Sequence, residues 1–345
     1  MSKLSEDPRI DPRLKAVFGK MPTLGGRDVA SREELLQKAH SERAVAGRAA
    51  LAAFVEQADT EEIAPSTGLS VTVEEFVSEP DGNTIKVRFV RPEGTERVGC
   101  VYYIHGGGMA TMSAFDGNYR AWARMIAAQG VAVAMVDFRN AVAASSAPEI
   151  APYPAGLNDC VSGVGWLVDN ADRLGIDPGR IVVAGESGGG NLTLATGMRL
   201  LREGRVGLIA GLYALCPYIA GSWPQPECPS SESNNGILLD LHDNTGAMGY
   251  GIEAFEAGDP LAWPGFATEA DVAGLPPTFI SVNECDPLRD EGINFYRLLL
   301  RAGVGAGCRE VMGTIHGTEI FPMACPDVSR ETASSIAAFC KGITR

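Results

Sequence analysis

The stretch that decides the fold is Ile181-Val182-Val183-Ala184-Gly185-Glu186-Ser187-Gly188-Gly189-Gly190-Asn191-Leu192. Its first four residues form an apolar, β-branched run that is typical of a strand covered on both faces. The residues after Ser187 are compatible with a helix, so Ser187 lies at a strand-to-helix corner in the Gly-x-Ser-x-Gly pattern of a nucleophile elbow. Such a corner brings the backbone on its two sides very close together, which predicts loop-shaping roles for Gly185 and Gly189.

A second glycine cluster, His105-Gly106-Gly107-Gly108, follows directly on an apolar run at 99–104 that predicts a strand. Consecutive glycines leave backbone amides with no side chains in front of them, as donors to a developing oxyanion require. We expect the amides of Gly107, Gly108 and Gly188 to form an oxyanion hole. Gly106 is expected to let the loop turn, and His105 to orient the loop by hydrogen bonds rather than transfer protons. A flexible turn without a catalytic role is the alternative.

A serine hydroxyl needs a base, and the base needs a third group that fixes its tautomer. Asp286 follows the strand predicted at 278–283, and His316 follows the last predicted strand. Both residues therefore fall at the same carboxyl edge of the sheet as Ser187. The order Ser187, Asp286, His316 is the one expected of an α/β-hydrolase.

Other residues compete for these roles. His242 is the weaker candidate for the base, and Glu284 and Asp290 are rivals of Asp286. Asp290 has an ordinary reason to exist at the start of a helix, where the dipole favours a carboxylate. His40 lies in an N-terminal helix and is expected to be a surface or packing residue.

Predicted strands and helices alternate along most of the chain. The strands are expected at 99–104, 131–137, 181–184, 208–215, 278–283 and 308–312, and the helices at 157–174, after Ser187, at 289–302 and at 329–341. This alternation indicates an α/β fold with a mostly parallel central sheet flanked by helices. Asp81-Gly82, between β-rich runs at 71–77 and 84–90, predicts a hairpin that supplies the antiparallel edge.

The chain is expected to form a single domain over residues 1–345, with its catalytic core at about 70–216 and 265–345. Residues 1 to about 60 have helical patterns, and the Trp- and Pro-containing segment 217–264 interrupts the alternation. We expect these two segments to form a helical cap over the active site. Met109, Trp223, Phe255 and Trp263 are candidate substrate-pocket residues, with ordinary packing as the alternative for each.

Composition excludes several classes of protein. With 45% apolar residues the chain can bury a large core, and its net charge of −14 argues against nucleic acid or an anionic membrane surface as a partner. No apolar run is long enough for a membrane span, and the first residues lack the apolar region of a signal peptide. Eight cysteines without a Cys-x-x-Cys pair favour reduced thiols and a cytoplasmic location, and predict no metal site.

Together these motifs resemble the hormone-sensitive lipase family of carboxylesterases, especially the brefeldin A esterase type. The shared motifs, in the family's order and approximate spacing, are His-Gly-Gly-Gly at 105, Gly-Glu-Ser-Gly-Gly-Gly-Asn at 185, Asp-Pro-Leu-Arg-Asp-Glu-Gly at 286 and His-Gly at 316. Val136-Asp137-Phe138-Arg139 is similar to the family's Asp-Tyr-Arg stretch. The resemblance covers about residue 99 to the C-terminus. It implies an α/β-hydrolase core, a helical cap and hydrolysis of short- to medium-chain esters without a cofactor.

The chain departs from this family's pattern in three places. Glu186 replaces the usual aspartate and Gly188 the usual alanine, which suggests a looser oxyanion donor. Residues 140–146 are inserted into the Asp-Tyr-Arg stretch, and Thr318 stands where an aromatic often follows the His-Gly pair.

The sequence supports a serine carboxylesterase that acts on a small-molecule ester through an acyl-enzyme intermediate. The same three side chains serve an amidase or a lactonase, because they do not select the leaving group. A binding protein on a hydrolase fold, like the plant gibberellin receptors, is a further alternative, although those receptors lack the histidine that this chain has at 316. A homodimer is an expectation from the family resemblance alone.

Overall fold

The computed structural model describes residues 2–94 and 96–343, which include one eight-stranded sheet of order β1-β2-β4-β3-β5-β6-β7-β8. The strands are β1 (Leu69–Val77), β2 (Thr84–Pro92), β3 (Val98–Ile104), β4 (Ala132–Val136), β5 (Ile176–Glu186), β6 (Gly211–Leu215), β7 (Thr278–Asn283) and β8 (Ala306–Val311). β1 pairs antiparallel with β2, and β2 with β4, while all other pairs are parallel. The predicted antiparallel edge is confirmed.

The α-helices flank this sheet or precede it. They are α1 (Lys3–Glu6), α2 (Pro12–Phe18), α3 (Arg32–Ala39), α4 (Glu42–Val55), α5 (Gly117–Ala127), α6 (Ala155–Asp169), α7 (Ala171–Leu174), α8 (Gly188–Arg202), α9 (Ser230–Ser233), α10 (Thr245–Tyr250), α11 (Ile252–Glu256), α12 (Glu269–Val272), α13 (Arg289–Arg301) and α14 (Pro326–Gly342). Short 3₁₀ helices lie at Glu56–Ala58, Val206–Leu208, Pro264–Phe266 and Thr318–Ile320.

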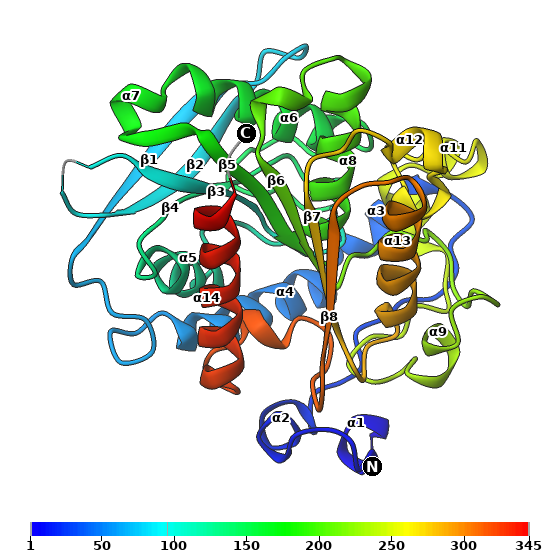
Figure 1. Cartoon of the computed structure of the whole chain (residues 1–345). Helices are drawn as coiled ribbons and strands as arrows, with labels where there is room; N and C mark the ends of the chain where they lie inside the picture. The colour runs from blue at the N-terminus through cyan, green and yellow to red at the C-terminus, as the bar shows by residue number, and fades with distance from the viewer. Residues whose placement is uncertain (1, 95, 344–345) are drawn as a thin grey trace.

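Both faces of the sheet are buried, which explains why its central strands are apolar throughout. In β3, Tyr102 packs with the cluster that contains α6, α8 and α13, whereas its neighbour Tyr103 packs with α5 and α14. Alternate side chains point to opposite faces of a strand, so every residue of a doubly covered strand meets a core. Figure 1 shows α14 in front of the sheet and α6 and α8 behind it. The predicted α/β-hydrolase architecture is confirmed.

Three local predictions need correction. The helix α5 was not expected, although Tyr119, Trp122 and Ile126 recur at helical spacing and are fully buried. The helical pattern expected within residues 1–60 is divided into several helices. α4 is separate from α3 because Ser41 starts a new helix by accepting a hydrogen bond from the amide of Ala44. The helix expected at 157–174 likewise breaks at Asn170, between α6 and α7.

The N-terminal segment contacts the insertion that follows β6. The amide of Leu24 donates to the carbonyl of Leu238 (2.7 Å), and the amide of Asp240 donates to the carbonyl of Leu24 (2.8 Å). The helices α1 and α2 lie at the bottom of Figure 1, and α2 buries Leu14 and Phe18 in a cluster with Ile237 and Ile315. The two segments expected to form a cap therefore lie against each other and against the loop that carries His316.

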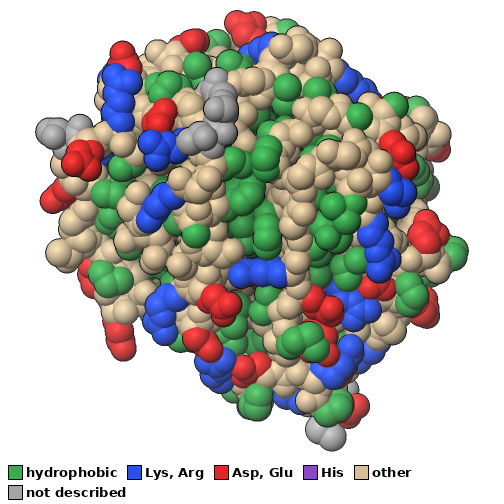
Figure 2. Space-filling view, in the orientation of Figure 1, with side chains coloured by type: hydrophobic (Ala, Val, Ile, Leu, Met, Phe, Trp, Pro, Cys, Tyr) green, Lys and Arg blue, Asp and Glu red, His purple; other side chains and the backbone are tan. Residues whose placement is uncertain are grey.

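The surface drawn in Figure 2 carries positive and negative side chains side by side, with hydrophobic side chains between them. No helix within the described residues combines the length and apolar character that a membrane crossing requires.

Candidate active site

Four loops that follow parallel strands build the site. His105 to Gly108 follow β3, Ser187 follows β5, Asp286 lies beyond β7, and His316 lies beyond β8. Because parallel strands end at the same edge of a sheet, residues that are far apart in the sequence meet there.

Ser187 occupies a strained corner between β5 and α8. Its φ of 56° and ψ of −119° are rare for a residue with a side chain, at a cost of about 1–3 kcal/mol. A Cβ at Gly185 would lie 2.5 Å from the carbonyl oxygen of Ile104, and one at Gly189 would lie 2.0 Å from the same oxygen. Both glycines are therefore required by close backbone contacts, for the reason that the sequence indicated.

The structure joins Ser187, His316 and Asp286 in one chain of hydrogen bonds. The Oγ of Ser187 lies 2.9 Å from Nε2 of His316, and Nδ1 of His316 lies 2.8 Å from Oδ2 of Asp286. Since a carboxylate only accepts, Nδ1 carries the proton and Nε2 is left to accept the serine hydroxyl. Asp286 is fully buried, and its Oδ1 accepts a hydrogen bond from the amide of Leu288 (2.9 Å).

Burial is the largest single effect and opposes the charged form of His316, but the carboxyl groups of Asp286, Glu319 and Glu186 together raise the pKa of the imidazole, with Asp286 contributing most. An imidazole with a raised pKa is a stronger base towards the serine proton. The geometry therefore supplies an oriented base next to the half-buried hydroxyl of Ser187.

The competing residues have other partners. His242 contacts the carbonyl of Ser231 (3.0 Å), and His40 contacts the carbonyl of Val142 (3.0 Å). Glu284 accepts a hydrogen bond from the amide of Gly313 (2.7 Å), and Asp290 accepts from the amide of Ser230 and from Arg289.

The glycine loop lies directly beside the nucleophile. Gly107 and Gly108 have positive φ values of 88° and 64° and line the cavity that contains Ser187. A Cβ added to Gly188 would lie 2.5 Å from the backbone nitrogen of Met109 and 2.8 Å from that of Gly108. The sequence suggested that glycine at 188 gives a looser oxyanion donor. The structure places the glycine loop so close to α8 that a Cβ at this position would require the backbone to move.

Glu186 holds the start of this loop, a role that sequence reasoning missed. Its Oε1 accepts from the amide of Gly106 (2.7 Å) and from the hydroxyl of Tyr119 (2.5 Å), and its Oε2 accepts from the hydroxyl of Tyr103 (2.6 Å). Burial raises the pKa of Glu186 to about 7, although the two phenols oppose the shift. A Cβ at Gly106 would meet Oε1 at 2.4 Å, so this glycine makes room for the carboxyl group. The expected explanation, that Gly106 lets the loop turn, is therefore incomplete, since Gly106 has no positive φ.

His105 is fully buried and stacks on Phe138, with ring centroids 4.3 Å apart and an angle of 15°. Its Nδ1 lies 3.0 Å from the carbonyl of Gly106, and its Nε2 lies 3.6 Å from Asp137. Burial lowers the pKa of His105. These contacts fit the loop-orienting role expected of it, and no contact joins it to Ser187 among the described residues.

The cavity over Ser187 has a volume of about 360 Å³. Apolar side chains dominate its walls, and they are Leu24, Leu51, Val55, Met112, Leu238, Leu239, Leu241, Ile320 and Phe321. They come from the N-terminal segment, the loop after β3, the insertion and the loop after β8. The side chain of Tyr218 also lines this cavity.

None of the four expected pocket residues is part of this lining. Trp223 stacks on the far side of Tyr218 (4.5 Å, 21°), and Trp263 packs edge-on to both rings. Phe255 packs on Trp263, while Met109 is buried in the core with a φ of 56°. Ordinary packing, the alternative given for each, describes their surroundings better, because the three aromatic rings contact other rings and Met109 is buried.

A second buried carboxyl group supports this aromatic cluster and also escaped sequence reasoning. Oε1 of Glu291 accepts from the amides of Ile219 (2.7 Å) and Ala220 (3.3 Å), and Oε2 accepts from Nε1 of Trp223 (2.7 Å). Burial raises the pKa of Glu291 to about 8. Glu291 belongs to the Asp-Glu-Gly part of the motif at 286, which was the only sequence feature that pointed to it. Its hydrogen-bond partners lie about seventy residues away in the sequence, so the motif alone did not predict them.

One group of possible metal ligands occurs at the site. Donor atoms of Cys216, Asp286 and His316 lie within 4.8 Å of one another. Burial raises the pKa of the Cys216 thiol well above its ordinary value, and the other two residues bind each other. A metal ligand must be deprotonated and free, so this donor set does not suit a metal ion.

Comparisons with known proteins agree with this geometry. A family model described as alpha/beta hydrolase fold matches residues 101–320. Carboxylesterase NlhH of Mycobacterium tuberculosis is 32% identical over 276 residues, which cover 79% of this chain and 83% of the relative.

Two solved structures extend the likeness to nearly the whole chain. Esterase Est22 has 69% sequence identity to this chain, and its structure superposes with a TM-score of 0.96. The match covers 99% of this chain and 100% of Est22. Brefeldin A esterase, named as a bacterial homologue of human hormone sensitive lipase, is 34% identical with a TM-score of 0.84, covering 98% and 95%. The chain belongs to the alpha/beta hydrolase fold family, within the hormone-sensitive lipase group that its motifs resemble.

Proposed function

We propose that this chain is a serine carboxylesterase that hydrolyses short- to medium-chain carboxylic esters. The observation that carries the proposal is the continuous hydrogen-bond chain from Ser187 through His316 to Asp286, at the floor of an apolar cavity. The names of the similar proteins, which include a carboxylesterase and two esterases, support the same reaction.

In the first half of the reaction, Oγ of Ser187 attacks the ester carbonyl while Nε2 of His316 takes its proton. Asp286 holds the imidazole in the Nδ1–H tautomer and stabilises the imidazolium that forms. His316 then gives the proton to the departing alcohol, which leaves the acyl group on Ser187. In the second half, His316 activates a water that releases the acid.

The negative oxygen of each tetrahedral intermediate would be held by amides of Gly107, Gly108 and Gly188. The two loop glycines line the cavity, and Gly188 is the first residue of α8, where unpaired amides point along the positive end of the helix. Removal of one such donor typically lowers kcat by about 100- to 1000-fold.

The N-terminal segment and residues 217–264 would form the cap. The support is that both segments contribute to the wall of the cavity, through Leu51 and Val55 on α4 and through Leu238, Leu239 and Leu241. These residues would set the acyl and alcohol preference of the enzyme.

A cytoplasmic location and a homodimer are also part of the proposal. All eight cysteines are free, which agrees with a reducing compartment. The edge strand β8 and the helix α14 are candidate dimer surfaces, and sedimentation velocity of the purified protein would test the assembly.

Replacement of Ser187 by alanine tests the proposed reaction. We expect the S187A variant to keep its thermal unfolding midpoint and to lose turnover of p-nitrophenyl butyrate. A folded variant with a near-wild-type rate would exclude the mechanism. Rates on matched ester, anilide and lactone substrates would separate an esterase from an amidase or lactonase, and complete inactivity towards all of them would favour a binding protein.

A further inference from the structure

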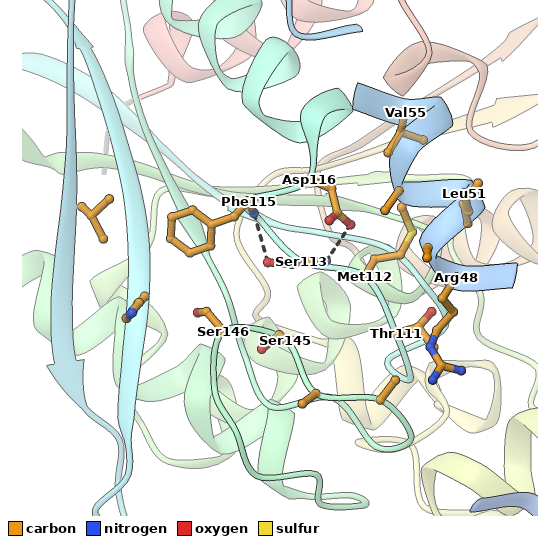
Figure 3. A pocket seen from close by; sticks show the side chains of 16 residues that line it. Arg48, Leu51, Val55, Thr111, Met112, Ser113, Phe115, Asp116, Ser145 and Ser146 are labelled. Carbon is orange, nitrogen blue, oxygen red and sulfur yellow. Dashed lines mark hydrogen bonds between the residues drawn. The ribbon is translucent and has the colours of Figure 1, made fainter. Parts of the chain in front are cut away.

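A second cavity lies next to the proposed active site. It has a volume of about 630 Å³, larger than the cavity over Ser187, and is bounded by α4, β1, β2 and the loops at 111–116 and 143–146. The two cavities share four lining residues, namely Leu51, Val55, Thr111 and Met112. In Figure 3 the α4 residues lie on one side, Ser145 and Ser146 on another, and Met112 between them.

The partition between the cavities has a fixed backbone and a flexible side chain. The carbonyl of Met112 accepts a hydrogen bond from Nδ2 of Asn140 (2.8 Å), and the amide of Thr111 donates to the carbonyl of Gly107 (3.1 Å). Met112 has a positive φ of 74°, so the backbone is committed to this turn. Its unbranched thioether accepts a weak hydrogen bond from the hydroxyl of Tyr119 (3.8 Å) and has other staggered rotamers, so a change of rotamer would open space between the two cavities.

The second cavity combines apolar walls with a positive rim. Alanines at 49, 52, 143 and 144 leave open apolar space, and Arg48 and Lys86 contribute the cationic groups. The Nζ of Lys86 has no hydrogen bond or ion pair within the described part of the chain, although Glu75 is opposite in the strand register. Arg48 donates through one nitrogen to the carbonyl of Ala39 (2.7 Å), and no carboxylate pairs with it among the residues that the structure describes.

Asp116 is the one acidic residue in the described lining. It accepts a hydrogen bond from the amide of Ser113 (3.0 Å), and burial raises the pKa of its carboxyl group. Although the whole chain has a net charge of −14, the described lining of this cavity therefore has two cationic side chains and one acidic side chain.

We propose that the second cavity is a binding chamber for the far end of an extended ester that terminates in a carboxylate, with Met112 as the gate between chamber and active site. The ester carbonyl sits at Ser187, an aliphatic chain passes Met112, and the terminal carboxylate meets Lys86. The segment at 143–146 that forms one wall belongs to the part of the sequence inserted relative to the family pattern. The inference rests on the proposed esterase function.

The test compares carboxylate-terminated esters with neutral esters of equal length. One series consists of p-nitrophenyl monoesters of dicarboxylic acids from succinate to dodecanedioate, each paired with its methyl-capped analogue. A second series consists of acetate esters of ω-hydroxy acids, which place the carboxylate on the alcohol side. We expect kcat/KM to be higher for the carboxylate-terminated ester than for its methyl-capped analogue once the chain is long enough to pass Met112. This preference should occur in only one of the two series, depending on whether the acyl side or the alcohol side of the ester enters the chamber.

Two variants locate the effect. The K86M variant keeps the apolar part of the lysine side chain but loses its charge. The ratio of kcat/KM for a carboxylate-terminated ester to that for its methyl-capped analogue should fall about fivefold, as expected for the loss of one partly exposed ion pair. The matched control is K20M, since Lys20 is exposed and its loss changes the net charge equally. In M112W the ratio of kcat/KM for long substrates to kcat/KM for short substrates should fall, because the larger ring fills the partition. This fall should be the same for carboxylate-terminated and methyl-capped esters.

Turnover of p-nitrophenyl acetate distinguishes a failure of the proposed esterase function from a failure of the proposed chamber. If wild-type protein hydrolyses neither acetate nor longer esters, the proposed function fails. If it hydrolyses acetate but shows no carboxylate preference at any length in either series, or if K86M and K20M behave alike, the chamber is excluded. Thermal unfolding of each variant shows whether a lost preference reflects a lost fold.

Discussion

Replacement of Gly188 by alanine is expected to inactivate the enzyme, even though alanine is the residue that the family pattern has at this position. The new Cβ would lie 2.5 Å from the backbone nitrogen of Met109 and 2.8 Å from Cα of Gly108, whereas ordinary contacts begin at 3.4 Å. Both partners are backbone atoms, so no side-chain rotamer relieves the contact. The loop must therefore move away from α8 by about 1 Å, a displacement large enough to cost about 100-fold in rate.

The size of the effect follows from what the loop does. An oxyanion donor acts at about 2.7–3.1 Å, and a hydrogen bond lengthened by 1 Å contributes little. Loss of one donor raises the barrier by about 3–4 kcal/mol, which lowers kcat by at least about 100-fold. KM should change little, because the donor binds the transition state more strongly than the substrate.

Steady-state kinetics with p-nitrophenyl butyrate measure this effect, and thermal unfolding checks that the variant is folded. The control is G207A, because a Cβ at Gly207 meets no atom within 4 Å and this residue lies in a short 3₁₀ helix away from the site. If folded G188A retains kcat within about threefold of the wild type, the loop is not held as the close contacts imply and the reasoning is wrong.

Two further predictions concern ionisable groups. Folding raises the pKa of Glu186 from 4.5 to about 7, so between these pH values the folded state keeps a proton that the unfolded state releases. The free energy of unfolding should therefore fall by about 3 kcal/mol as the pH rises from 4.5 to about 7. The E186Q variant should lack this dependence, which urea unfolding at several pH values would reveal; an unchanged slope would contradict the assignment. Asp286 raises the pKa of His316, and activity requires the neutral imidazole, so wild-type kcat/KM should fall as the pH drops through that raised pKa. In D286N the acid limb should move to lower pH, with kcat reduced by about 10⁴-fold, and a profile that keeps its position would show that Asp286 does not govern the base.

The sequence was sufficient to predict the residues that topology alone brings together. Ser187, Asp286 and His316 each follow a strand of one parallel sheet, so their common edge can be read from the order of strands and helices. The same argument placed the glycine loop after β3.

The sequence was insufficient where a contact depends on side chains that several elements bring together. The carboxyl group of Glu186 meets Tyr103 from β3 and Tyr119 from α5, and the helix α5 was itself missed. Trp223 and Trp263 were expected at the pocket, but packing on Tyr218 and a hydrogen bond to Glu291 hold the Trp223 ring behind the cavity wall. Such arrangements are set by tertiary packing, which no local pattern encodes.

The central claim is that Ser187 is the nucleophile and His316 its base, and covalent labelling tests it most directly. Wild-type protein, S187A and H316A would be incubated with a fluorophosphonate probe, and the modified peptide identified by mass spectrometry. We predict one adduct per chain on the peptide that contains Ser187, no adduct in S187A, and much slower labelling in H316A. An esterase that stays active and unlabelled, or that is inactivated by an adduct on another residue, would contradict the account.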